Sequence, residues 1–292
     1  MDRTRGRTTV LGGVRDGKYP HGNSLLVRGT EETVLIDPSL SLVGRDDLPR
    51  PDRILNSHCH EDHVAGNHLY PGIPVHLHTA DQPGLGSLDA MMAIYGMSPA
   101  IDAAFRRAIV DDFHWVPRPD ARRFADGDVF DVGGCRIRVI HAPGHTRGHS
   151  LFHVEPDDVL YLGDIDLSSF GPYYGDAWSS LEDFERTLAA VRRIEARWYA
   201  TFHHVGLVEG RAAFLERLDR FAAVIDTREA RLLEFLAAPR TLDEIVAHRF
   251  VYRPGDAVVF AADVERRSMR QHLDRLLADG RIAERESTLV RL

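Results

Sequence analysis

The chain has 292 residues, of which 43% are hydrophobic and 27% are charged, and its formal net charge is −8 at pH 7. This composition is typical of a globular protein large enough for more than one domain, and the acidic balance argues against a protein that tracks a long polyanion. Without a long apolar run we expect no membrane span, and without an apolar stretch at the amino terminus or a set of paired cysteines we expect a cytoplasmic protein.

The first part of the chain, residues 8–56, reads as alternating strands with glycine turns. One apolar strand ends at Asp37, and a second short strand, residues 53–57, opens into the segment His58 to His63, which reads His-x-His-x-Asp-His. Imidazole nitrogens and carboxylate oxygens are ligands of zinc, iron and manganese. The segment therefore predicts a metal site, with the rigid end of the strand aiming its ligands.

The middle of the chain begins with a helix start and then a strand within residues 64–80. Residues 81–120 carry methionines and aromatic residues that are partly at helical spacing. Two interpretations stay open for this stretch, namely ordinary helical packing and a lid over the site.

Three later strands also end in possible ligands. An alternating strand over residues 135–141 leads to a Pro-Gly turn that presents His145. An apolar strand over residues 158–163 ends at Asp164, and a strand that begins at residue 198 ends in the pair His203 and His204. A single histidine at a strand end is a weak signal, but four such endings in series indicate one joint site.

These motifs resemble those of the metallo-β-lactamase-fold hydrolase superfamily, in the same order, over roughly residues 8–225. The resemblance implies an α/β fold, a four-layer αββα sandwich with two metals in a cleft at one edge. It also implies a division of the ligands. Metal 1 would take His58, His60 and His145, metal 2 would take Asp62, His63 and the last histidine, and Asp164 would bridge them. For the last histidine we favour His203, with His204 as the alternative.

The ligand set predicts hydrolysis by a metal-bridged hydroxide, because two cations lower the pKa of the water they share. Asp62 or Asp164 could relay a proton to the leaving group. We expect two divalent ions, with zinc favoured over iron or manganese, and a small ester or thioester substrate. The alternatives are a metal-dependent ribonuclease or phosphodiesterase and a mononuclear iron oxygenase, a class that the family also includes.

Other residues are expected to support the site or to contact the substrate. The resemblance implies that Asp37 orients a ligand histidine from behind, and His149 is expected to support the His145 turn. The loop over residues 166–178 follows Asp164 closely and is aromatic, so it is expected to form a wall for the substrate. The candidate substrate contacts are Tyr173, Tyr174, Trp178 and His204.

After a predicted helix over residues 179–197, a different unit is expected to begin near residue 226. Residues 1–225 would form the catalytic domain, and residues 226–292, with three helices and a terminal hairpin, would form a winged-helix-like domain. This second unit has 12 arginines and 12 acidic residues, so packing or homo-oligomer contact is favoured over nucleic-acid binding, which stays possible.

Overall fold

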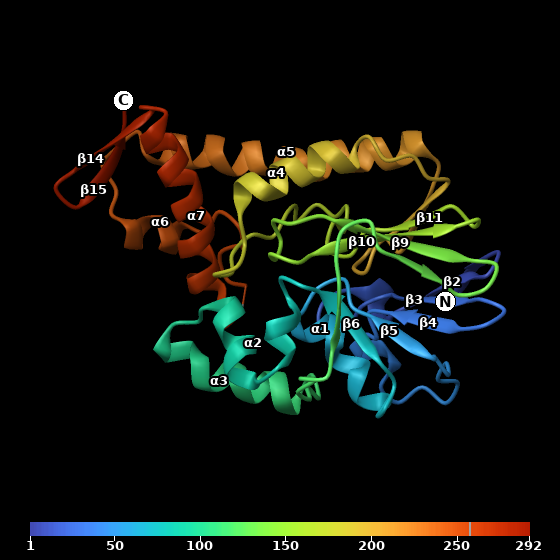
Figure 1. The fold of residues 1–292 in the computed structure, drawn as a ribbon. Helices are drawn as coiled ribbons and strands as arrows, with labels where there is room; N and C mark the ends of the chain where they lie inside the picture. Colours follow the sequence, from blue (N-terminus) through green and yellow to red (C-terminus); the bar gives the residue numbers. More distant parts are fainter. Residues whose placement is uncertain (257) are drawn as a thin grey trace.

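Two β-sheets lie face to face in the computed structural model, which describes residues 1–256 and 258–292 (Figure 1). Helices α4 (Leu181–Val191) and α5 (Arg211–Phe235) cover one sheet, and helices α1 (Glu61–Val64), α2 (Leu88–Tyr95) and α3 (Pro99–Asp111) lie on the side of the other. The predicted four-layer αββα sandwich is therefore confirmed. No helix of the described residues is both long enough and apolar enough to span a bilayer.

The first sheet has seven strands in chain order. They are β1 (Arg3–Arg5), β2 (Thr8–Leu11), β3 (Ser24–Arg28), β4 (Thr33–Ile36), β5 (Arg53–Leu55), β6 (Val75–His78) and β7 (Arg122–Phe124). Strands β4 to β7 run parallel, whereas the earlier strands pair antiparallel. Because parallel strands end at the same edge, the residues that follow β4 and β5 come together there.

The second sheet has the order β13-β12-β11-β10-β9-β8. Its strands are β8 (Val129–Asp131), β9 (Arg136–His141), β10 (Ser150–Glu155), β11 (Val159–Tyr161), β12 (Trp198–Ala200) and β13 (Leu207–Glu209). Strands β11 and β12 are parallel, so the segments that carry Asp164 and His203 leave this sheet at one edge as well.

Alternation along the central strands builds the core between the sheets. In β3, Leu25 and Val27 face the second sheet, while Leu26 packs toward the helices on the other side. Helices α2 and α3 contribute Met91, Phe105 and their neighbours to that outer core. Most of residues 81–120 thus pack as ordinary helices, and Tyr95 at the end of α2 also stacks on His60, with ring centroids 5.2 Å apart.

The carboxy-terminal residues have a small core of their own, which includes Leu232, Ile245 and Leu273. Helix α6 (Leu242–His248) begins with a capping box of Thr241 and Glu244. Helix α7 (Ala261–Ala278) and the hairpin of β14 (Ile282–Arg285) and β15 (Thr288–Arg291) follow. Helix α5 runs without a break through the expected boundary at residue 225. The division into two domains and the winged-helix character of the second remain predictions.

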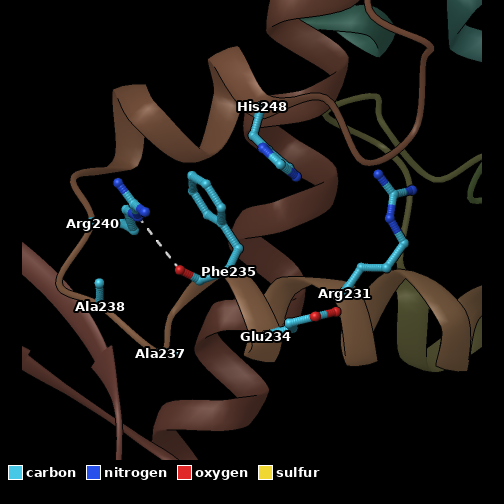
Figure 2. Close-up of a pocket in the computed structure, with 7 residues that line it drawn as sticks. All are labelled: Arg231, Glu234, Phe235, Ala237, Ala238, Arg240 and His248. Carbon is cyan, nitrogen blue, oxygen red and sulfur yellow. Dashed lines mark hydrogen bonds between the residues drawn. The ribbon is translucent and has the colours of Figure 1, made fainter.

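An open groove of about 490 Å³ lies on this carboxy-terminal unit (Figure 2). Its lining residues are Arg231, Glu234, Phe235, Ala237, Ala238, Arg240 and His248. Both arginines donate to backbone carbonyls of the unit itself. The groove shares no residue with the histidine and aspartate clusters described next.

Candidate metal centre

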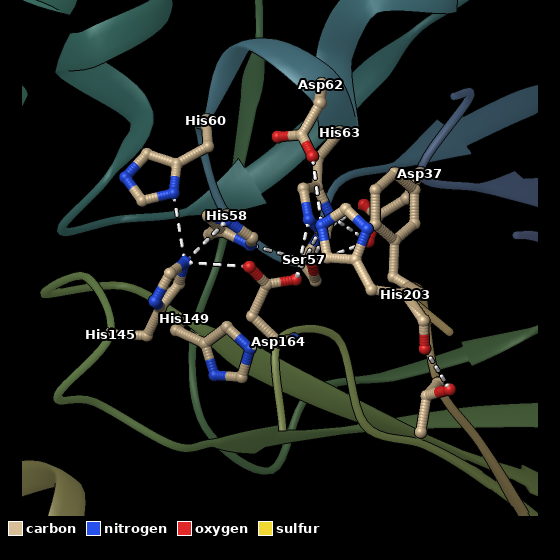
Figure 3. A network of polar contacts seen from close by, with 12 residues as sticks. Asp37, Ser57, His58, His60, Asp62, His63, His145, His149, Asp164 and His203 are labelled. Carbon is tan, nitrogen blue, oxygen red and sulfur yellow. Dashed lines mark hydrogen bonds and ion pairs between the residues drawn. The ribbon is translucent and has the colours of Figure 1, made fainter. Parts of the chain in front are cut away.

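The predicted ligands gather at the edge where the strands of both sheets end (Figure 3). Two groups form, and within each group one ligand atom per residue lies within 4.8 Å of all the others. The first group contains His58, His60, His145 and Asp164, and the second contains Asp62, His63 and His203. The structure thus brings all seven residues together in the grouping expected for two metals.

In the first group, three imidazoles point nitrogen atoms at one another. The Nε2 atom of His145 lies 3.2 Å from Nε2 of His58 and 2.9 Å from Nδ1 of His60. All three side chains are buried. Three inward nitrogens at such spacing repel one another unless a cation lies between them or one of them carries a proton.

Asp164 lies between the two groups. One carboxylate oxygen is 3.1 Å from Nε2 of His145, and the other is 2.8 Å from Nε2 of His63. In the second group, Nε2 of His203 lies 3.0 Å from the Asp62 carboxylate. A carboxylate with one oxygen directed at each group is in the position that a bridging ligand requires.

The outer nitrogens of these rings meet hydrogen-bond acceptors. Nδ1 of His63 lies 2.8 Å from the Asp37 carboxylate, and Nδ1 of His145 lies 3.0 Å from the carbonyl of Tyr173. Nδ1 of His203 lies 2.8 Å from the carbonyl of Gly17. A proton held on the outer nitrogen leaves the Nε2 lone pair free on the inner side, which is the tautomer that a metal ligand needs.

His149 supports the turn and the carboxylate together. Its Nδ1 lies 3.0 Å from the carbonyl of Ala142, and its Nε2 accepts the backbone N–H of Asp164 at 3.1 Å. Burial lowers the pKa of His149 to about 3, so its ring is neutral and can accept this bond.

Charge in the centre is arranged to suit cation binding. Burial acts to raise the pKa of Asp164, but His63, His145 and His203 together hold it well below its usual value. Burial also lowers the pKa of the His58 ring. At neutral pH Asp164 is therefore ionised and His58 is neutral, the states in which these groups bind metals. At three other ligands burial acts to lower the pKa, but the neighbouring carboxylates outweigh it and raise the pKa of His60 and of His203 to about 9 and that of His63 well above its usual value. A bound cation would displace the protons from these rings.

The donor set fits divalent metal ions. Buried Asp62 Oδ2, His63 Nε2 and Asp164 Oδ1 have no aligned hydrogen-bond partner among the described residues, although each lies close to an atom of the opposite charge type. Buried polar atoms are normally satisfied. These three atoms lie close together without hydrogen-bond geometry, which is the arrangement expected of ligand atoms directed at a metal ion between them.

The four residues predicted to contact the substrate differ in how close they lie to the metal ligands. The ring centroid of Tyr173 lies 5.6 Å from that of His145, and His204 is half-buried beside His203. Tyr174 is fully buried with its hydroxyl on His272, and Trp178 packs on the outer helical core beneath Arg147. The expectation that Tyr174 and Trp178 contact the substrate therefore has no support in the structure.

Two carboxylates at the site were missed by sequence reasoning. Asp176 is buried, and its Oδ2 lies 3.0 Å from Nε2 of His60 without full hydrogen-bond alignment. Glu61, inside the histidine motif, is buried and accepts hydroxyl hydrogen bonds from Tyr19 and Tyr95. No motif marks Asp176, whereas the position of Glu61 between two ligands was a usable signal.

Helix α7 carries four arginines that could meet phosphates, Arg266, Arg267, Arg270 and Arg275, and most of them are already engaged. Arg266 pairs with Asp243, Arg275 pairs with two glutamates, and Arg267 donates to two backbone carbonyls. In the described part of the chain only Arg270 of this set has no such contact. The structure thus weakens the case for nucleic-acid binding through α7.

Known proteins share this sequence pattern and fold. Residues 19–225, more than half of the chain, match the family model of the metallo-beta-lactamase superfamily. An acyl-coenzyme A thioesterase of Bos taurus is 26% identical over 172 residues, which are 52% of this chain and 62% of the relative. A hydroxyacylglutathione hydrolase of Methylococcus capsulatus is 29% identical over 209 residues, 67% of this chain and 70% of the relative. The chain spans less than two thirds of the length of the first curated relatives.

The crystal structure of a metallo-beta-lactamase family protein from Thermus thermophilus has a TM-score of 0.73 to this structure at 23% identity. The match covers 98% of this chain and 99% of the other, so the fold similarity includes the carboxy-terminal unit. Family match, fold and the buried histidine and aspartate clusters agree with one another. The chain therefore belongs to the metallo-beta-lactamase superfamily.

Proposed function

We propose that this protein is a dinuclear metal-dependent hydrolase of small acyl thioesters or esters. The observation that carries the proposal is the position of Asp164, which directs one oxygen at each of two buried ligand groups. A site for one ion alone would not need a carboxylate shared between two groups.

The ligands would divide as the two groups do. His58, His60 and His145 would hold one ion, Asp62, His63 and His203 the other, and Asp164 would touch both. Bound ions would supply Lewis acidity for the acyl carbonyl and a water of lowered pKa as nucleophile. Zinc is our first choice, and nitrogen and oxygen ligands of this kind also suit iron and manganese.

The protein itself would hold the protons and the ring orientations. Asp62 and Asp164 are the carboxylates within reach of the reacting groups, and either could pass a proton to the leaving thiol or alcohol. Ser57 is fully buried and donates its hydroxyl to Asp37, so it serves as a support and not as a nucleophile.

The choice of an acyl substrate draws on the relatives and on the wall of the site. The names of two relatives describe thioester hydrolysis on coenzyme A and hydrolysis of hydroxyacylglutathione. Beside the ligands, the rings of Tyr173 and Tyr19 lie near His145 and His203 with centroid separations of 5.6 and 6.4 Å. Aromatic rings of this kind suit an apolar acyl group.

The test begins with the metal content of gently purified protein, measured by elemental mass spectrometry. We expect close to two equivalents per chain for the wild type, followed by activity on acyl-coenzyme A and acyl-glutathione thioesters. The Asp164→Asn variant should lose at least one equivalent and most of the activity. Two equivalents with no thioester or ester hydrolysis would overturn the substrate class, and failure to bind any divalent metal would overturn the proposal as a whole.

A further inference from the structure

One short loop touches two of the ligand histidines from outside. The carbonyl of Tyr173 accepts from Nδ1 of His145 at 3.0 Å, and Asp176 places Oδ2 3.0 Å from Nε2 of His60. The Tyr173 hydroxyl donates to the other oxygen of Asp176 at 2.9 Å. The residues Tyr173 to Asp176, here called the support loop, therefore face the outer nitrogens of both rings.

Helix α7 of the carboxy-terminal unit grips the backbone of this support loop. Arg267 donates through Nε to the carbonyl of Gly175 at 2.6 Å, and Gln271 donates to the carbonyl of Tyr174 at 2.8 Å. The packing is so close that a Cβ atom at Gly175 would lie 2.3 Å from Cγ1 of Val264. Successive carbonyls of the loop are thus satisfied by one helix.

The same two side chains also tie the loop to its surroundings. The Gln271 carbonyl oxygen accepts the backbone N–H of Leu181, the first residue of α4, at 2.6 Å. Nη1 of Arg267 donates to the carbonyl of Gly96, just after α2, at 2.6 Å. Figure 1 shows α7 running from the terminal hairpin down to α2. The helix therefore closes the outside of the site against two helices of the sandwich.

We infer that α7 is a strap that positions the metal ligands His60 and His145 through the support loop, with Asp176 as a positioning residue. The inference rests on the proposed function, because it concerns ligands of the proposed ions. Groups that orient a ligand from behind commonly change metal affinity by about 10- to 100-fold when they are removed. In this protein the support loop is held by α7 residues more than 80 positions away in the sequence, which gives the carboxy-terminal unit a role at the metal centre.

The experiment compares Zn²⁺ affinity among full-length variants by competition with a chromogenic chelator. Gln271→Ala and Arg267→Ala should each weaken the tighter binding event by about 10-fold or more. Arg270→Ala is the matched control, since Arg270 is exposed on the same helix, and it should stay within about twofold of wild type. Asp176→Ala should weaken binding as well, and Asp176→Asn, which keeps an acceptor oxygen, should recover part of the loss.

Circular dichroism and thermal unfolding of the metal-free variants check the fold. If Gln271→Ala does not fold, Gln271→Glu takes its place, because it keeps an acceptor for Leu181 and replaces the donor to Tyr174 with a carboxylate oxygen. Folded α7 and Asp176 variants that bind Zn²⁺ as tightly as Arg270→Ala would overturn the strap. A wild type that binds no Zn²⁺ would overturn the proposed function instead, so the two failures are distinguishable.

Discussion

Asp37 offers the sharpest test of how the centre is built, through the substitution Asp37→Asn. One carboxylate oxygen accepts from the Ser57 backbone N–H at 2.7 Å. The other accepts from the Ser57 hydroxyl at 2.5 Å, the Tyr161 hydroxyl at 2.9 Å and Nδ1 of His63 at 2.8 Å. Asp37 has a φ of 47°, which asparagine tolerates better than alanine does, so the backbone is left undisturbed.

The magnitude follows from these contacts. Asparagine has only one acceptor oxygen, so its amide group must face either the Ser57 N–H or the three other donors. A hydrogen bond to a charged group contributes roughly 1.5–3 kcal/mol, and the two hydroxyls can turn to accept from the amide. We therefore expect the free energy of unfolding to fall by about 2–4 kcal/mol.

The same change should act on the metal. An amide N–H directed at Nδ1 of His63 favours the tautomer with its proton on Nε2, the nitrogen that faces Asp164. When a metal takes Nε2, the ring must instead carry its proton on Nδ1, where the amide N–H offers it no acceptor. We expect affinity at the group of Asp62, His63 and His203 to drop about 10- to 100-fold, with little change at the other group.

The assays are urea unfolding of the metal-free protein and Zn²⁺ titration against a chelator. Asp52→Asn is the control, because Asp52 accepts a backbone N–H from Thr33 at an exposed position, at the opposite end of β5 from the ligand segment. The free energy of unfolding of this control should fall by less than about 1 kcal/mol, and its metal binding should be unchanged. If Asp37→Asn matched this control in both assays, the reasoning that a buried carboxylate sets the His63 tautomer would be refuted.

Three further predictions test other parts of the structure. His203→Ala should remove about one equivalent of metal while His204→Ala retains both, and the reverse pattern would transfer the ligand role to His204. Gly144→Ala should lower the free energy of unfolding and weaken metal binding at His145. Gly144 has a φ of 130°, and a Cβ there would lie 2.3 Å from the Phe184 backbone. An unchanged thermal unfolding temperature would contradict this prediction. Burial lowers the pKa of His78 to about 4, so the unfolded state takes up more protons between pH 6.5 and 4, and stability falls as pH drops through that window. Between pH 7 and 5, the free energy of unfolding of His78→Asn, measured with urea, should therefore fall by about 1 kcal/mol less than that of the wild type. An equal fall in both proteins would contradict the lowered pKa of His78.

Sequence reasoning reached the fold and the clustered residues because local signals repeat there. Each strand that ends in a ligand carries its own apolar run and turn, so His58, His145 and Asp164 could be found without knowing how the strands pair. The caps of α4 and α6 at Ser180 and Thr241 are likewise written in a few adjacent residues.

The rest depends on contacts between distant segments. Nothing around Asp176 in the sequence indicates that it meets His60, because that contact exists only after the loop is held by α7. Tyr174 looked like a wall residue because aromatic residues cluster near Asp164, yet the buried partner His272 lies almost a hundred residues away. Side-chain direction in an irregular loop has no period from which it could be read.

The continuous helix α5 limits where insertions and deletions can be accommodated as this sequence evolves. Near its start Arg211 bonds to the carbonyl of Ile194, and further along Arg228 bonds to the carbonyls of Pro172 and Phe170. Each residue added to an α-helix turns everything beyond it by about 100° and advances it by about 1.5 Å. A single insertion between Arg211 and Arg228 would therefore swing the carboxy-terminal unit away from the site. Length variation should be tolerated in the exposed turns of the sheets but not in α5, because this helix fixes the angle at which residues 236–292 meet the support loop.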